Sequence, residues 1–145
     1  MTRFVKFLKL SGREKGRFLE AAFWLGVYRA AILFVPFKKI AGRLGKHQAE
    51  TDEAPLDVAV RQETLAVARA VRAMARRLPW DCKCLVQAAA GKRMLDRRRI
   101  PATLYLGAAK DEENKLIAHA WLRAGDVILA GKREMERFTV VSTFA

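Results

Sequence analysis

Cysteine and histidine are scarce in this 145-residue sequence, which contains two residues of each type. Cys82 and Cys84 are separated by a single residue, so a disulfide between them would be strained and no framework of bridges can form. Reduced thiols in the cytoplasm are therefore expected. A C-x-C pair with one histidine offers three metal ligands at an atypical spacing and no obvious fourth, so no metal and no cofactor is expected.

The sequence also lacks a long uncharged apolar run. Its most apolar segment, residues 18–37, is interrupted by Glu20 and Arg29, which leaves too short a stretch for a membrane-spanning helix. The apolar stretch begins too late for a signal peptide, and no small-residue cleavage site follows it. Neither a membrane span nor a secretion signal is expected.

The same segment predicts an amphipathic helix. Its apolar residues recur at helical spacing, at Leu19, Phe23, Gly26, Val27, Ala30, Leu33 and Phe34. One interpretation is a helix packed on the domain itself. The other is a helix that docks on a partner protein or makes peripheral contact with a membrane, because basic residues flank it at Arg13, Lys15, Arg17, Lys38 and Lys39.

Acidic residues are few relative to basic ones. The chain has 28 Lys and Arg against 15 Asp and Glu, a formal net charge of +13. This excess favours acidic peptides, anionic membranes or nucleic acid as partners. Because no basic stripe is interleaved with stacking aromatics and no nucleic-acid motif is present, nucleic-acid binding is not expected.

Two regions are predicted along the chain. Residues 1–50 form a basic, amphipathic helical segment, and residues 51–145 form the main domain. A polar stretch over residues 42–55 reads as a linker in which His47 is a solvated loop residue. Pro55 is expected to open the next helix, which Pro79 ends. The predicted buried face of that helix comprises Val60, Thr64, Val67, Val71, Met74 and Leu78.

A second helix is predicted from a cap at Asp81 to about Asp96, and small residues at 88–91 would let another element pack closely against it. After Pro101 the pattern becomes strand-like. Strands are expected at residues 103–108, 116–122, 127–130 and 138–143, with turns at 111–114 and 124–125. The fold class is therefore α+β, with helices followed by a mainly antiparallel sheet.

Cys84 and His119 are the candidate catalytic pair. Cys84 falls in the first turn of its helix, where unpaired N–H groups and the helix dipole favour a thiolate. The same N–H groups can serve as an oxyanion hole. His119 lies between alanines on a strand, on the same face as Ile117 and Trp121, and could act as base. Cys82 is a possible helper or bystander, and a buried cysteine with a satisfied strand histidine is the alternative.

Six segments carry a resemblance to a known family. They are L-E-A-A-F-W-L (19–25), V-P-F-K-K-I-A (35–41), P-W-x-C-x-C-L-V-Q-A-x-A (79–90), M-L-x-R-R-x-I-P-A-T-L-Y-L-G-A (94–108), A-H-A-W-L (118–122) and F-x-V-V-S-T-F (138–144). Together, and in this order, they resemble the lasso-peptide leader peptidases of the transglutaminase-like superfamily. The likeness spans nearly the whole chain.

The resemblance implies a papain-like thiol protease fold and one substrate, a ribosomally made lasso-peptide precursor. It implies cleavage at the leader–core junction, typically two residues after a threonine. It also implies a separate leader-recognition protein and an ATP-dependent macrolactam cyclase as partners, because the chain begins directly at the peptidase segment. By the resemblance, Cys84 is the nucleophile and His119 the base that later protonates the leaving amine.

The resemblance does not assign the third catalytic residue to a clear position in this sequence. Many relatives have an Asp about a dozen residues after the histidine, a position near Gly131 here. Asp126 is the only Asp after His119, and a turn at 124–125 would separate it from the imidazole by more than about 10 Å. Asp126 is therefore kept as a candidate, and Glu134 or a backbone carbonyl could orient the ring instead. A transglutaminase-type acyl transferase and a non-catalytic adaptor remain as alternative functions.

Overall fold

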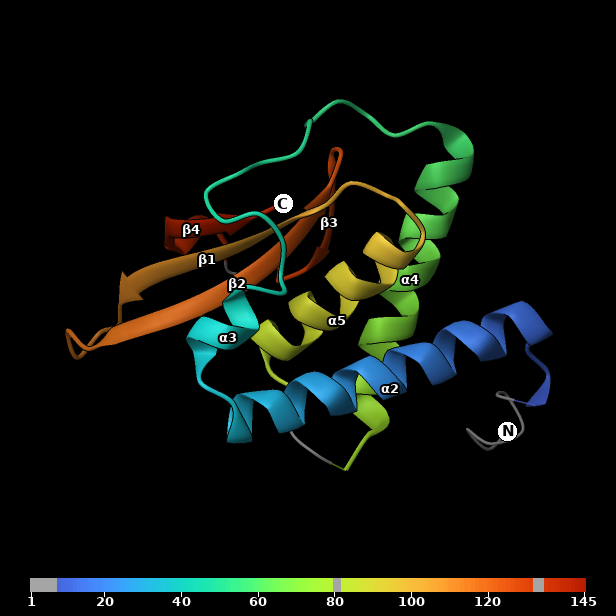
Figure 1. The fold of residues 1–145 in the computed structure, drawn as a ribbon, viewed down its shortest axis with the longest axis horizontal. Helices are drawn as coiled ribbons and strands as arrows, with labels where there is room; N and C mark the ends of the chain where they lie inside the picture. The colour runs from blue at the N-terminus through green and yellow to red at the C-terminus, as the bar shows by residue number, and fades with distance from the viewer. Residues whose placement is uncertain (1–7, 80–81, 132–134) are drawn as a thin grey trace.

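The computed structural model describes residues 8–79, 82–131 and 135–145. In chain order the elements are α2 (Gly12–Phe34), α3 (Phe37–Ala41), α4 (Val58–Arg77), α5 (Cys84–Arg97), β1 (Thr103–Lys110), β2 (Leu116–Ala124), β3 (Val127–Ala130), the 3-10 helix η1 (Met135–Arg137) and β4 (Thr139–Phe144). The predicted α+β class is confirmed. Figure 1 shows the long helices gathered beside one sheet, with α5 in contact with both the sheet and α2.

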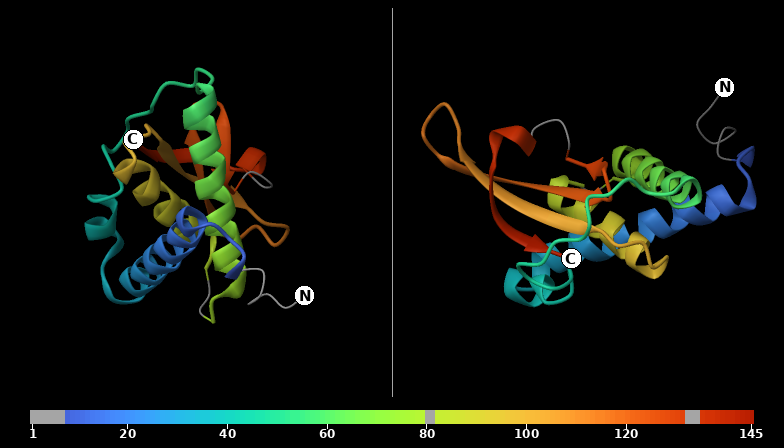
Figure 2. Two further views of the ribbon diagram at one scale, coloured as in Figure 1. Left: turned by 90° about the vertical axis from the view of Figure 1, so that its right-hand side faces the viewer. Right: turned by 90° about the horizontal axis from the view of Figure 1, so that it is seen from above.

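The four strands form an antiparallel sheet in the order β3-β2-β1-β4. All four lie close to the predicted ranges, and Asp111–Lys115 forms the turn of the long β1–β2 hairpin, which projects beyond the helices in Figure 2. The second hairpin turns at Gly125 and Asp126, because Ala124 pairs with Val127. The expected turn at 124–125 was therefore displaced by one residue, and a register shift after Leu122 adds to the difference.

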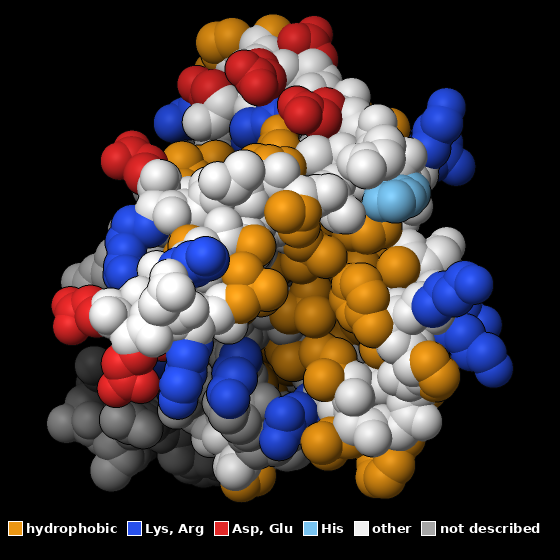
Figure 3. All heavy atoms as spheres, turned by 90° about the vertical axis from the view of Figure 1, so that its left-hand side faces the viewer, with side chains coloured by type: hydrophobic (Ala, Val, Ile, Leu, Met, Phe, Trp, Pro, Cys, Tyr) orange, Lys and Arg blue, Asp and Glu red, His pale blue; other side chains and the backbone are white. Residues whose placement is uncertain are grey.

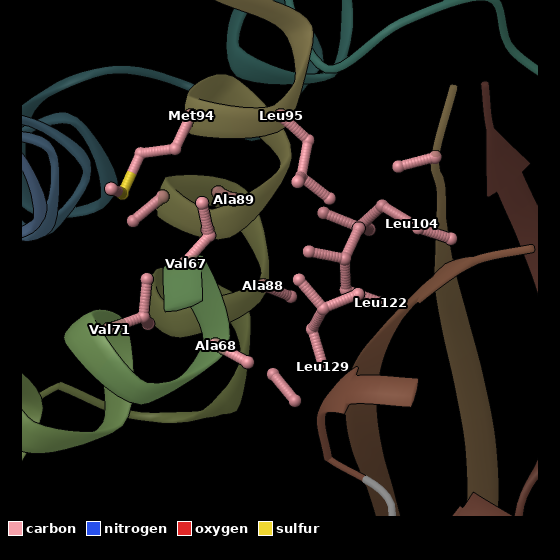
Figure 4. Close-up of a cluster of buried hydrophobic side chains, with 14 of the residues drawn as sticks. Val67, Ala68, Val71, Ala88, Ala89, Met94, Leu95, Leu104, Leu122 and Leu129 are labelled. Atoms are coloured by element: carbon pink, nitrogen blue, oxygen red, sulfur yellow. The ribbon is translucent and has the colours of Figure 1, made fainter. Parts of the chain in front are cut away.

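The main core lies between α4, α5 and the sheet. Figure 4 shows Val67 and Val71 of α4 on one side of α5, and Leu104 and Leu122 of the strands on its other side, beside Ala88. The small residues of α5 allow this close approach. A Cβ atom at Gly91 would lie 2.8 Å from Cδ2 of Leu122, so a larger residue at this position would push the helix from the sheet. Burial of each such leucine stabilises the fold by about 1.5–3 kcal/mol.

Helix α4 begins later than predicted. Its N-cap is Asp57, whose carboxylate accepts a hydrogen bond from the Val60 amide at 2.9 Å, so Pro55 precedes the helix and does not open it. The predicted buried face is largely correct, since Thr64, Val67 and Val71 are fully buried. The helix ends at Arg77, before Pro79, because proline cannot donate the next helical hydrogen bond.

Helix α5 also begins later than expected. Its N-cap residue is Lys83, and the Lys83 carbonyl accepts the first intrahelical hydrogen bond from the Gln87 amide at 3.0 Å. The prediction that Asp81 occupies the cap position is therefore wrong, and Asp81 itself lies outside the described residues. As a result, Cys84 is the first residue of the helix.

Helix α2 packs through a different face from its most regular apolar stripe. Ala21, Leu25 and Tyr28 lie in the core, and burial raises the pKa of the Tyr28 hydroxyl. The stripe residues remain exposed, Leu19 by 62% and Phe34 by 83%. Of the two interpretations of this helix, packing on the domain is realised, but not by the predicted stripe. No helix in the described part of the chain is long and apolar enough to cross a membrane.

The exposed apolar surface continues past the end of α2. Leu33, Phe34, Val35 and Phe37 are all exposed where α2 leads into α3. Figure 3 looks onto this side of the molecule and shows hydrophobic side chains around a central hollow, with Lys and Arg along its lower and right-hand margins. Basic side chains therefore border this apolar surface.

Residues 46–51 run beside the sheet and are hydrogen-bonded to it, so they do not form a free linker. The Gln48 amide donates to the Thr143 carbonyl at 2.7 Å, and Lys46 exchanges backbone hydrogen bonds with Ala145. The imidazole of His47 stacks on Phe144 at a centroid distance of 5.1 Å. His47 is exposed, as expected, but its interpretation as a purely solvated loop residue was wrong.

Candidate active site

Cys84 occupies the N-terminal position of α5. Its own amide and the amides of the next two residues belong to the first turn, whose N–H groups have no hydrogen-bond acceptor within the helix. The cap residue Lys83 has no acceptor atom in its side chain, so it cannot cap them. The helix start thus offers N–H donors and the positive end of the helix dipole at the thiol.

The sulfur of Cys84 lies at the edge of β2. The amide of Ala120 donates a hydrogen bond to Sγ of Cys84 at 3.4 Å. This amide points away from β1 at a level where β3 has ended, because the last pair between β2 and β3 joins Leu122 to Ala130. The start of α5 therefore contacts β2 beyond the end of β3 and brings the thiol beside the residue that follows His119. Hydrogen bonds donated to a sulfur anion are stronger than those donated to a neutral thiol.

His119 lies on β2 with its ring held on two sides. Its imidazole stacks on Trp121 at 6.0 Å and on Phe138 at 5.0 Å between ring centroids. Gly107 faces His119 across β1 and β2, and a Cβ atom there would lie 2.8 Å from both Phe138 and the Trp121 ring. The missing side chain at Gly107 is thus a packing requirement of the aromatic rings around the imidazole.

A backbone carbonyl contacts the imidazole. Nε2 of His119 lies 2.9 Å from the carbonyl oxygen of Gly131. A carbonyl can only accept, so Nε2 carries the hydrogen and Nδ1 is the basic nitrogen of the neutral ring. Gly131 stands near the position at which the resemblance expects an aspartate, and its φ of +78° is one that glycine adopts readily.

Asp126 lies at the far end of β2 from His119. It sits in the β2–β3 turn, and its carboxylate pairs with the Arg61 guanidinium at 3.2 Å. Ala124, the last residue of β2, is five residues along the strand from His119, a length of roughly 16 Å. The structure therefore brings Cys84 to the strand position next to His119 but does not bring Asp126 to the imidazole. Glu134 lies outside the described residues.

Cys82 precedes α5 and packs partly against the hydrophobic core. Its carbonyl oxygen accepts a hydrogen bond from Nε2 of Gln87 at 2.8 Å. This bond ties the segment before Cys84 to the first turns of the helix. Sequence reasoning assigned no role to Gln87, although its position three residues after Cys84 places it one helical turn along the same side.

A layer of aromatic and polar side chains supports the ring of His119 from β1 and β2. Trp121 stacks on Tyr105 at 5.5 Å, and Nε of the buried Arg123 donates to the Tyr105 hydroxyl at 3.0 Å. Burial raises the pKa of Tyr105, while the Arg123 contact opposes that shift. The two terminal nitrogens of Arg123 also donate hydrogen bonds. Nη1 donates to the carbonyls of Asp52 and Gly125, and Nη2 donates to the carbonyl of Thr51. These bonds tie the stack to the segment that precedes α4.

Comparison with known proteins identifies one family. A sequence model of the transglutaminase-like superfamily matches residues 31–143, about three quarters of the chain. The matched range includes Cys84, His119, strands β1 to β3 and all of β4 except its last residue. No curated protein and no solved structure gives a significant match.

Proposed function

Because the chain belongs to the transglutaminase-like superfamily, whose members generally use a cysteine for catalysis, we propose that it is a cysteine peptidase that removes the leader from a lasso-peptide precursor. The observation that carries the proposal is the position of the Cys84 sulfur, at a helix N-terminus and bonded to the Ala120 amide next to His119. The motifs that resemble leader peptidases along nearly the whole chain support the choice of substrate.

The proposed reaction uses Nδ1 of His119 as the base. Nδ1 takes the proton of the Cys84 thiol, and the thiolate attacks the scissile carbonyl carbon to form a C–S bond. The C–N bond then breaks as the imidazolium returns the proton to the leaving amine. Water, deprotonated by the imidazole, hydrolyses the thioester to a carboxylate and restores the thiol. The first-turn N–H groups of α5 stabilise the oxyanion in both steps.

The Gly131 carbonyl has a defined part in this proposal. A hydrogen bond from Nε2 to a carbonyl keeps Nδ1 free to accept the thiol proton, and it stabilises the imidazolium that forms. An aspartate would do the same with a full negative charge, so a carbonyl is the weaker partner. We expect Asp126 to play no direct part, since it is paired with Arg61 in the turn.

The proposed partners are a separate leader-recognition protein, which delivers the precursor, and a macrolactam cyclase, which uses the amine that cleavage frees. The proposed location is the cytoplasm, where reduced thiols persist. The exposed apolar stripe of α2 is available for contact with one of these proteins.

The test is a reconstituted reaction of the purified chain with a candidate precursor and recognition protein, followed by mass spectrometry. The proposal expects a leader fragment with a free carboxylate and a core fragment with a free amine, and no reaction with Cys84→Ala. Intact precursor in the wild-type reaction, with every component folded, would contradict it.

Acyl transfer to an amine is the second candidate, because the transglutaminase-like superfamily is of the cysteine peptidase and acyltransferase type. The two differ in the acceptor that resolves the thioester. Hydroxylamine added to the reaction discriminates between them. A peptidase yields mainly the carboxylate fragment, whereas a transferase converts the fragment mainly to the hydroxamate.

A further inference from the structure

A cleft lies between α2, α4 and the start of α5. Its volume is about 820 Å³, within the usual range of ligand-binding pockets. Figure 1 shows α2 crossing the C-terminal half of α4 near the point where α5 begins. The side chains that line the cleft include small apolar residues of α4 (Ala66, Ala70 and Ala73) and Phe18 of α2. The cleft floor is therefore apolar and has room along α4.

The walls of this cleft are strongly basic. Arg17, Arg69, Arg72 and Arg76 line it, and Glu14 is the one carboxylate among the described lining residues. Arg17 is neutralised by Glu63 at 2.6 Å. Among the described residues, no carboxylate pairs with the three arginines of α4.

The three arginines of α4 form one row. They are spaced by three and four residues, which places them on one side of the helix, along the cleft. Like charges held together on a concave surface repel one another and attract an anion. A guanidinium also binds a carboxylate through two parallel hydrogen bonds, which a single point charge does not provide.

The cleft ends at the segment that carries the proposed nucleophile. Cys82 and Gln87 belong to its lining, and Gln87 bonds the carbonyl of Cys82. Cys84 follows Cys82 by two residues in the sequence and begins α5, although it is not itself part of the described lining. A chain held along α4 would thus extend toward Cys84.

We propose that this cleft binds an acidic segment of the peptide substrate, with its carboxylates on Arg69, Arg72 and Arg76 and its apolar side chains on the alanine floor. The inference rests on the proposed function, because it makes the ligand part of the cleaved peptide. A peptide fits better than a nucleic acid, because the lining combines charge with small apolar side chains, and Phe18 is the one aromatic residue among the described residues that line the cleft.

The test measures binding without cleavage. The full chain with Cys84→Ala is titrated into a fluorescein-labelled peptide in which glutamates alternate with leucines, and into a matched peptide with glutamine in place of each glutamate. The proposal expects the acidic peptide to bind more tightly, with an affinity that falls as salt rises. Equal binding of both peptides would overturn it.

Two pairs of substitutions on α4 locate the site. Arg69→Gln with Arg76→Gln removes two charges from the cleft, whereas Arg61→Gln with Arg77→Gln removes two charges from the same helix outside the cleft lining. The cleft pair is expected to weaken binding about tenfold and the control pair by less than about twofold. Equal losses of affinity in the two variants would show that binding responds to net charge alone, and would contradict the proposed binding site. Circular dichroism melts verify that both variants fold.

A single-stranded oligonucleotide of similar charge tests the other class of ligand. If it binds more tightly than the acidic peptide and loses affinity with the cleft pair, the peptide assignment is wrong.

Precursor cleavage separates this inference from the proposed function. The cleft pair should raise KM and leave kcat within about twofold, because it removes binding that is equal in the ground and transition states. If the acidic peptide binds in a way that depends on the arginines but no precursor is cleaved, the proposed binding site in the cleft stands and the proposed peptidase function is wrong.

Discussion

Nε2 of His119 lies 2.9 Å from the carbonyl oxygen of Gly131. This contact decides which ring nitrogen carries the hydrogen, because a carbonyl oxygen cannot donate. It also shows how the chain can orient the imidazole without an aspartate at this place.

His119 is expected to be the Nε2–H tautomer when its ring is neutral. Long-range ¹H–¹⁵N spectra of the imidazole nitrogens measure this directly, and His47→Ala assigns the signals because the chain has two histidines. A hydrogen on Nδ1 would contradict both the contact and the proposed base.

Gly131→Ala should displace the imidazole. A Cβ atom there would overlap the Ala120 carbonyl and lie 3.0 Å from Nε2 of His119, at a φ that alanine rarely adopts. We expect kcat for precursor cleavage to fall at least about tenfold with a smaller change in KM. Gly16→Ala is the matched control, since its Cβ meets nothing within 4 Å. Full activity in Gly131→Ala would show that the contact does not position the base.

Asp126→Ala should retain most activity. The Asp126–Arg61 pair is exposed, by 44% and 48%, so its loss should cost less than about 1 kcal/mol of unfolding free energy. Precursor cleavage and a urea melt measure the two effects. A fall in kcat of several orders of magnitude, with the fold intact, would restore Asp126 as the third catalytic residue.

Two leucines of α2 should respond very differently to truncation. Leu25→Ala is expected to lower the unfolding free energy by about 2–5 kcal/mol, because Leu25 is fully buried. Leu19→Ala, at 62% exposure, should change it by less than about 0.5 kcal/mol. Urea unfolding compares the two variants. Equal losses would mean that the apolar stripe, and not the Leu25 face, packs on the domain.

Glu63 should make stability depend on acid pH. Hydrogen bonds from Arg17, and then from Arg98, lower the Glu63 pKa from 4.5 to about 2 despite partial burial. A lowered folded-state pKa gives stability that is complete above pH 4.5 and is lost as pH falls toward 2. Glu63→Gln should therefore cost about 1–2 kcal/mol at pH 7, and the difference from wild type should shrink below pH 4.5. A difference that is constant from pH 7 to 2.5 would contradict this.

Much of the fold could be predicted because local patterns and tertiary structure agree. The buried face of α4 follows the spacing of Thr64, Val67 and Val71, and alternation with turn residues located all four strands. The small residues before Gly91 correctly indicated a closely packed neighbour for α5. In these elements the hydrophobic pattern leaves one way to bury the apolar side.

The remaining features depend on contacts distant in sequence. Helix α2 has two apolar sides, and its local pattern does not reveal that Leu25 is buried while Leu19 is exposed. The pairing of residues 46–48 with β4 needs a partner almost a hundred residues away. The positions of Cys84 and His119 in their elements were predictable. A backbone carbonyl was one of the predicted partners of the imidazole, but its identity as that of Gly131 was not predictable, because a backbone acceptor has no signature in sequence.

We propose Cys84 as the nucleophile of leader removal, and a comparison of three proteins decides this. The precursor is incubated with wild type, Cys84→Ala or Cys82→Ala, each with the recognition protein, and is then analysed by mass spectrometry. We expect cleavage by wild type, retention of most activity in Cys82→Ala, and intact precursor with Cys84→Ala. Cleavage by a folded Cys84→Ala variant at the wild-type rate would contradict it, as would loss of cleavage in Cys82→Ala alone.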